Sequence, residues 1–195
     1  KQLGESVFRN LQSPLILSEY VLHCFARSSD FEIRVHALAG LYILIGRYGL
    51  ELENFYDRLL ELLTQKINGR SIFEHKQCKR VYKLIENALR SSKVPFGMVC
   101  SFVKLLLAEV FRQSSEFTCW AIALIFNIFK KHQNLLNCLD KKATDSPPEV
   151  AQIKSDLEIL QVHFLPQVRS VLKDINNKLS RTDFLDIDAF SNIRL

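Results

Sequence analysis

The run from Phe117 to Lys131 constrains the fold more than any other part of the sequence. Its apolar residues are so closely spaced that a helix here has almost no polar face before Lys130 and Lys131. Neighbouring elements must cover such a helix on most sides. A second helical pattern precedes it from Phe96 to Val110, where apolar residues recur every three or four positions. The stretch from Pro95 to Lys131 therefore predicts a pair of helices at the centre of the fold.

The rest of the chain favours an all-α fold as well. Its 195 residues include only six glycines and five prolines, and no strand-length segment alternates apolar with polar residues between turn signals. The expected helices pair into antiparallel hairpins of roughly 40 residues, which is the period of HEAT-like repeats. Hairpins of this kind bury a core only by stacking. We therefore predict an irregular α-solenoid, a HEAT-like stack of antiparallel helical hairpins.

Start and stop signals place the helices of the first half. Ser13-Pro14 starts the first helix and Asp30 caps the second. A third helix is expected over residues 51–66, and Asn68-Gly69 supplies its stop signal. A fourth helix, over residues 75–90, has an exposed side rich in lysine and arginine.

One α-helical domain is predicted for residues 1–195. Residues 140–149 read DKKATDSPPE and form its one clear exposed loop. Residues 183–195 form a tail that is both acidic and apolar. Because the chain opens at Lys1 without a methionine and inside a helical pattern, we expect it to be the C-terminal part of a longer protein.

Sequence motifs for catalysis, metal binding and cofactor binding are missing. The chain has no G-x-S-x-G elbow and no glycine-rich phosphate loop. Its five cysteines stand at least 19 residues apart and form no zinc spacing with the histidines, so we expect structural thiols in a reducing compartment. The longest apolar run has 13 residues, whereas a membrane-spanning helix needs about 20. We therefore predict a protein that is not an enzyme, with no catalytic residues, metal, cofactor, small-molecule substrate or membrane contact.

Two polar features near the C-terminus have structural interpretations. Asp186 and Asp188 lie in the apolar tail, where carboxylates keep such a segment soluble. His163 stands at a junction between two helices, so we interpret it as a helix cap or a buried hydrogen-bond partner.

Positive charge gathers in the middle of the chain. Residues 70–131 contain eleven lysines and arginines against four glutamates, a balance of +7, and the net charge of +5 leaves −2 for all other residues. Six basic residues in and around the fourth helix are candidates for contact with RNA or with a partner protein: Lys76, Lys79, Arg80, Lys83, Arg90 and Lys93. A merely solvated helix face has the same pattern, and no RNA-binding signature with stacked aromatic residues accompanies it. RNA and the acidic side chains of a partner are equally suitable targets.

A family resemblance runs from Val35 to Leu179. The segment from His36 to Leu63 resembles the CCAAT-binding-factor (CBF) domain of the nucleolar complex (Noc) proteins, in which an Ala-Leu-x-Gly-Leu-x-x-Leu helix precedes a Phe-Tyr-x-x-Leu motif. The matching residues are Ala37, Leu38, Gly40, Leu41, Leu44, Leu50, Phe55, Tyr56 and Leu59. Farther on, Leu157, Leu160, His163, Phe164, Pro166 and Val168 resemble the family's Leu-x-x-Leu-x-x-His-Tyr-x-Pro-x-Val signature. Residues 66–73 depart from the family, because they lack its usual aspartate-proline turn.

This resemblance implies a non-enzymatic nucleolar scaffold in small ribosomal subunit assembly and processing of its precursor RNA. The implied partners are a Nop-fourteen-like ribosome-assembly protein and the pre-ribosomal particle, with possible contact to its RNA, and the implied location is the nucleolus within the nucleus. Two alternatives stay open on the residues alone. One is a HEAT-like protein-protein adaptor unrelated to ribosomes, and the other is a helical module that binds RNA directly.

Overall fold

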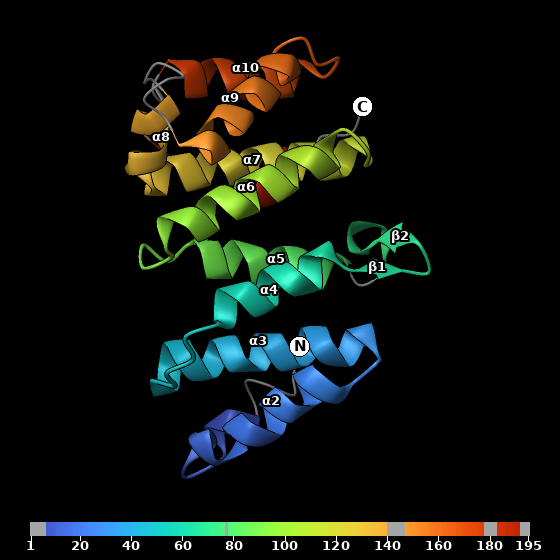
Figure 1. Ribbon diagram of the computed structural model, residues 1–195, viewed down its shortest axis with the longest axis vertical. Helices are drawn as coiled ribbons and strands as arrows, with labels where there is room; N and C mark the ends of the chain where they lie inside the picture. Colours follow the sequence, from blue (N-terminus) through green and yellow to red (C-terminus); the bar gives the residue numbers. More distant parts are fainter. Residues whose placement is uncertain (1–6, 77, 140–146, 178–182, 192–195) are drawn as a thin grey trace. The chain divides into compact units, whose positions relative to one another are not determined.

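The computed structural model describes residues 7–76, 78–139, 147–177 and 183–191. In these residues the fold is all-α apart from one small hairpin, which confirms the predicted class (Figure 1). The helices are η1 (Pro14–Leu17), α2 (Ser18–Arg27), α3 (Phe31–Tyr48), α4 (Phe55–Thr64), η2 (Ile72–Glu74), α5 (Cys78–Leu89), α6 (Phe96–Val110), α7 (Ser115–Lys131), α8 (Gln133–Leu139), α9 (Pro148–Leu160), α10 (Pro166–Asn176) and α11 (Ile187–Ser191).

The chain falls into two compact units, Lys1–Ala88 and Leu89–Leu195, and each is described by itself. Both the single domain over residues 1–195 and the solenoid arrangement therefore stay predictions. None of the helices in the described residues is long and apolar enough to cross a bilayer.

In the first unit, α2 and α3 form a helical hairpin. The Asp30 carboxylate caps α3 as predicted, because its Oδ1 accepts a hydrogen bond from the Glu32 backbone N–H at 2.8 Å. Gly40 faces α2 closely, since a Cβ atom built there would lie 3.5 Å from Cγ1 of Val21. The helix ends at Gly49, whose φ of 72° is the left-handed conformation that glycine adopts without strain.

The segment after α4 differs from the prediction. Asn68 and Gly69 do not end a helix, because α4 already stops at Thr64. Instead they are the two turn residues, both with positive φ, of an antiparallel hairpin between β1 (Lys66–Ile67) and β2 (Arg70–Ser71). Asparagine followed by glycine suits such a turn because both residues tolerate positive φ. This hairpin occupies the stretch where the sequence departs from the family pattern.

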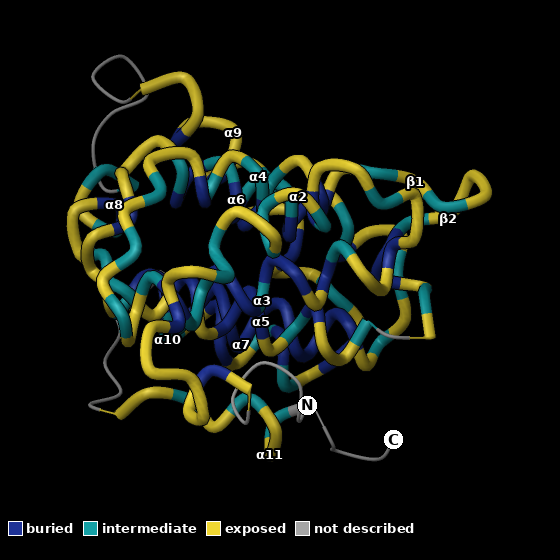
Figure 2. The backbone as a smooth tube through the Cα atoms, turned by 90° about the horizontal axis from the view of Figure 1, so that it is seen from below, coloured by how far each residue is buried: buried dark blue, intermediate teal, exposed yellow. Residues whose placement is uncertain are grey.

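The central element of the second unit is α7. Twelve of its 17 residues are buried (Figure 2), and it packs against α6, α8, α10 and α11. The predicted central helix is thus confirmed within its unit. Its partner α6 buries the expected stripe, with the exception of Phe96, which is 38% exposed because it occupies the first, open turn.

Two predicted segments near the C-terminus are only partly described. Residues 140–146 of the predicted loop lie outside the described residues, and Pro148 and Glu149 already belong to α9. In the predicted tail, residues 183–191 are described and contain α11, which packs on α7. The Asp186 carboxylate caps this short helix by accepting a hydrogen bond from the Ala189 backbone N–H at 3.2 Å. Residues 192–195 lie outside the described part.

Candidate interaction surface on α5

The charged residues of α5 gather on one face because the apolar residues occupy the other. The buried residues of α5 include Val81, Leu84, Ile85 and Ala88, whereas the basic side chains on the opposite face of the helix are exposed. Exposed basic residues on α5 and in the turn before it are Lys76, Lys79, Arg80 and Lys83, and we call them the α5 basic face. The fold thus brings four of the six predicted residues together along one helix and the turn before it.

Lys83 and Arg80 of the α5 basic face each contact a neighbouring side chain. Lys83 Nζ lies 3.1 Å from Glu86 Oε2, and the Glu86 side chain is only 8% exposed, so the lysine charge balances a buried carboxylate. Arg80 Nη1 contacts His36 Nε2 of α3. Since a guanidinium can only donate, His36 Nε2 must be the acceptor and the imidazole must be neutral. Partial burial, followed by the charge of Arg80, lowers the pKa of His36 and favours that neutral form.

The hydroxyls of two tyrosines fix the C-terminal end of α5. Tyr42 of α3 donates a hydrogen bond to the Asn87 carbonyl at 2.6 Å, and Tyr56 of α4 donates to the Ala88 carbonyl at 3.5 Å. These bonds satisfy carbonyls that a helix end leaves without partners in its own backbone. The α5 basic face is therefore presented by a helix whose position is fixed by α3 and α4.

The remaining two predicted residues belong to the second unit. Arg90 follows the end of α5, and Lys93 lies in the turn before α6. Both are exposed, and the backbone N–H of Lys93 donates to Ser91 Oγ at 3.2 Å.

Sequence reasoning missed two further cations in the first unit. Lys66 and Arg70 are exposed on the hairpin, where they flank the Asn68-Gly69 turn. The signal that could have found them is the Asn-Gly pair between two short polar segments, which favours a two-residue hairpin turn.

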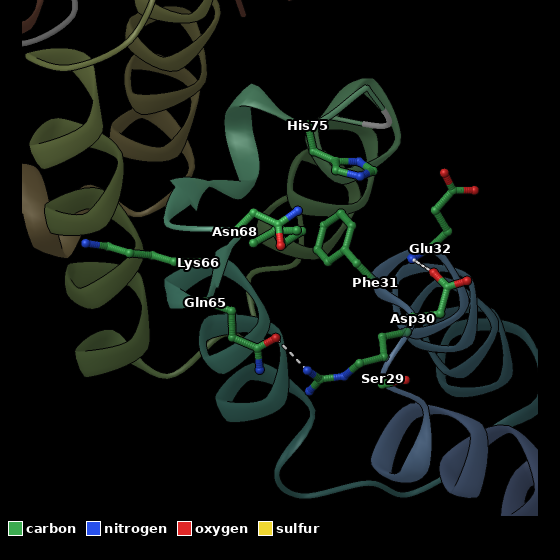
Figure 3. Close-up of a pocket in the computed structure, with 10 residues that line it drawn as sticks. Ser29, Asp30, Phe31, Glu32, Gln65, Lys66, Asn68 and His75 are labelled. Atoms are coloured by element: carbon green, nitrogen blue, oxygen red, sulfur yellow. Dashed lines mark hydrogen bonds between the residues drawn. The ribbon is translucent and has the colours of Figure 1, made fainter.

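A depression of about 650 Å³ in the first unit is lined by residues from the α2–α3 turn, the start of α3, the hairpin and His75 (Figure 3). Its main cation, Arg34, is already used inside the fold. Its Nη1 donates to Gln65 Oε1 at 2.5 Å, and its Nε donates to the Phe25 carbonyl at 3.2 Å. The His75 ring packs edge-on against Phe31, with 5.0 Å between the ring centroids. These contacts hold structure together and do not form a nucleophile-base pair.

The other residues that could carry chemistry also have structural contacts. His163 Nδ1 accepts a hydrogen bond from the Leu165 backbone N–H at 3.2 Å, as expected for a residue at a helix junction. Burial raises the pKa of the Cys100 thiol to about 11 and also raises that of Cys119, so both stay protonated at neutral pH. The described residues contain no group of three or more potential metal ligands.

Comparison with known proteins identifies the family. The CBF/Mak21 family model matches residues 34–156. The chain is 26% identical to the nucleolar complex protein 4 homolog of Gallus gallus over 197 residues, which cover 93% of this chain and 37% of that protein. It is 26% identical to the Homo sapiens homolog over 90% of this chain and 36% of the relative. Nucleolar complex protein 4 of Saccharomyces cerevisiae is 27% identical over 78% of this chain and 28% of its own length.

All three relatives are named nucleolar complex protein 4 or a homolog of it, which agrees with the resemblance to the Noc proteins. The chain spans little more than a third of the length of the relatives. The matched range ends at residue 156, so the signature around His163 lies beyond it. It nevertheless includes most of α3, all of α4 to α8 and most of α9. The chain therefore belongs to the CBF/Mak21 family.

Proposed function

We propose that this chain is part of a non-enzymatic nucleolar scaffold in small ribosomal subunit assembly and pre-rRNA processing. The observation that carries the proposal is the CBF/Mak21 match over residues 34–156, together with relatives named nucleolar complex protein 4. The fold fits a scaffold, since its helices present fixed outer faces over a buried interior. A Nop-fourteen-like ribosome-assembly protein is the proposed partner, and the nucleolus within the nucleus is the proposed location.

Affinity purification of the tagged full-length protein from its own cells tests this function. We expect small-subunit precursor RNA and a Nop-fourteen-like protein to co-purify, and a fluorescent fusion to concentrate in the nucleolus. An exclusively cytoplasmic fusion that brings down no precursor RNA would refute the proposal. That outcome would favour the HEAT-like adaptor.

A second candidate, direct RNA binding, is favoured by the α5 basic face. Of its members, Lys76 and Lys79 are exposed lysines, and Lys83 balances the buried carboxylate of Glu86. Replacing Lys76 and Lys79 by glutamate should weaken binding to an RNA of the small-subunit precursor. The slope of log K against log salt should fall by about 0.7 for each lost phosphate contact.

The matched control for this experiment is Lys154→Glu, because Lys154 is an exposed lysine on α9 of the second unit. Unchanged RNA affinity in the Lys76/Lys79 variant would exclude an RNA contact through this face. If partner binding fell in the same variant while RNA binding did not, the face would be assigned to the acidic side chains of a partner protein.

A further inference from the structure

The described part of the C-terminal tail is bound to α7 through its main chain. The carboxamide of Asn127 pairs with both backbone groups of Leu185: Nδ2 donates to the carbonyl at 2.9 Å, and Oδ1 accepts from the N–H at 2.8 Å. A neighbouring β-strand offers an extended peptide the same pair of hydrogen bonds. Asn127 therefore recognises a backbone and requires no particular side chain.

One turn farther along α7, Lys130 makes a second contact to the same segment. Its Nζ donates to the Asp183 carbonyl at 2.9 Å. The ammonium also lies 5.7 Å from the ring centroids of both Phe126 and Phe184. Lys130 thus holds the main chain at Asp183, two residues before Leu185. It also favours an aromatic side chain at position 184, between them.

The side chains of the segment are held only lightly. None of the residues from 183 to 190 is fully buried, and Phe184 is 58% exposed. Leu185, Ile187 and Phe190 are half-buried, while the three aspartates of the segment are exposed. Segments with few buried apolar contacts open at a lower free energy than the rest of a protein. The free energy that holds this segment on α7 is therefore a small part of the stability of the second unit.

The charges of the two sides are complementary. The last turn of α7 carries Lys130 and Lys131, and the segment carries Asp183, Asp186 and Asp188. A ligand for this site should thus be extended where it meets Asn127, should carry an aromatic residue beside Lys130, and should be acidic.

We propose that the α7 surface around Asn127 and Lys130 is a docking site for an acidic and apolar peptide that is extended where it meets Asn127. Residues 183–191 occupy it as an intramolecular ligand, which a partner's segment of the same chemistry replaces. Because a tethered ligand has an effective concentration of about 1 mM, a free peptide competes poorly unless its protein is also held elsewhere. The site consequently admits a partner that is already bound to the same complex.

The experiment uses the full chain with Leu185→Pro, which removes the N–H that Asn127 Oδ1 accepts. A fluorescent peptide with the sequence of residues 183–191 is titrated into this variant and into the unsubstituted chain, and its anisotropy is measured. We expect at least about tenfold tighter binding to Leu185→Pro, since the competing segment is released. Circular dichroism should show at most the loss of the five residues of α11, because the segment contributes no fully buried residue before Ser191 and the other helices do not depend on it.

Asn127→Asp tests the site itself, because it replaces the Nδ2 donor with an oxygen that faces the peptide carbonyl. Added to Leu185→Pro, it should weaken peptide binding about tenfold, as expected for losing one hydrogen bond and leaving an acceptor opposed. Asn137→Asp on α8, an exposed asparagine outside the site, is the matched control and should change nothing. The proposal would be overturned if the peptide did not bind to Leu185→Pro, or if Asn127→Asp did not weaken its binding.

Hydrogen exchange on the unsubstituted chain gives a measurement that needs no variant. The Leu185 amide should exchange at least tenfold faster than the amides in the middle of α7, since the segment opens without unfolding the unit. Equal rates would show that the segment leaves only on global unfolding, which excludes a removable ligand. Concentration-dependent dimers that disappear with Asn127→Asp would overturn the proposal in another way, because a second copy would then be the occupant.

Discussion

Arg34→Ala tests what holds α2, α3 and the end of α4 together in the first unit. The guanidinium donates to the Phe25 carbonyl at 3.2 Å and to Gln65 Oε1 at 2.5 Å, and it forms an ion pair of 3.3 Å with Glu61. Its central carbon also lies 4.8 Å from the centroid of the Phe25 ring. The Arg34 side chain of α3 thus contacts α2 through Phe25 and α4 through Glu61 and the C-cap residue Gln65.

The expected loss of stability follows from how far each contact is shielded from water. The side chain of Arg34 is 15% exposed, so its two hydrogen bonds to Phe25 and Gln65 should contribute about 1 kcal/mol each. The cation-π contact adds about 0.5–1 kcal/mol. Glu61 is 62% exposed, and its ion pair should therefore contribute less than about 0.5 kcal/mol. Arg34→Ala should lower the free energy of unfolding of the first unit by about 3 kcal/mol.

Hydrogen exchange with peptide-level resolution measures this loss in the unit concerned, through the amides of α3 and α4. Fluorescence of Trp120, the single tryptophan, reports on the second unit. Arg27→Ala is the control, since Arg27 is an exposed arginine in the last turn of α2 and should cost less than about 0.5 kcal/mol. A loss below about 1 kcal/mol for Arg34→Ala would refute the reasoning, because it would mean that water replaces these contacts at no cost.

Four further perturbations have outcomes that follow from single positions. Gly49→Ala should destabilise the first unit by about 1 kcal/mol because φ is positive there. Gly46→Ala, inside α3 with open space around it, should stabilise the unit by up to about 1 kcal/mol, and hydrogen exchange of the α3 and α4 amides measures both glycine variants. Burial, followed by the charge of Lys131, lowers the pKa of His132 below 6.5. The unfolded chain then binds the proton more readily, so the second unit should lose stability as pH falls below about 6.5, and His132→Gln should reduce that loss in denaturant titrations. Phe126→Ala, at a fully buried position of α7, should cost about 3–5 kcal/mol by the Trp120 signal.

The helices were predictable from sequence where a local signal acts alone. Asp30 caps α3 through its own side chain, and the apolar run of α7 admits only a buried helix, so both were found at their observed places. Asn68-Gly69 was misassigned because the same pair suits a helix end and a hairpin turn. Only the position of the preceding helix end, at Thr64, separates the two structures. That end depends on tertiary contacts that no local pattern contains.

The candidate surface was predictable in composition and less so in its contacts. Exposure of Lys79 and Lys83 follows from the helical period, because the opposite face is apolar. The partner of Arg80 comes from α3, 44 positions away in the sequence, and the docking of Leu185 on Asn127 joins residues 58 positions apart. Such pairs depend on how helices pack, and a spacing rule within one helix cannot find them.

The helices α5 and α7 differ in the contacts they can make because they expose different side chains. One face of α5 is apolar and buried, so its other face can present lysine and arginine side chains to solvent. Hydrogen bonds from Tyr42 and Tyr56 to its last carbonyls hold its C-terminal end in place. Sequence reasoning assigned α7 to the interior alone, since nearly all of its side chains are apolar. Asn127, a half-buried position near the end of the helix, is where α7 meets a peptide main chain. Because the Asn127 carboxamide is only half-buried, water can hydrogen-bond to it when the segment leaves, so the cost of breaking this contact stays small. The helix that organises the second unit therefore also presents the polar groups that hold the described part of the tail.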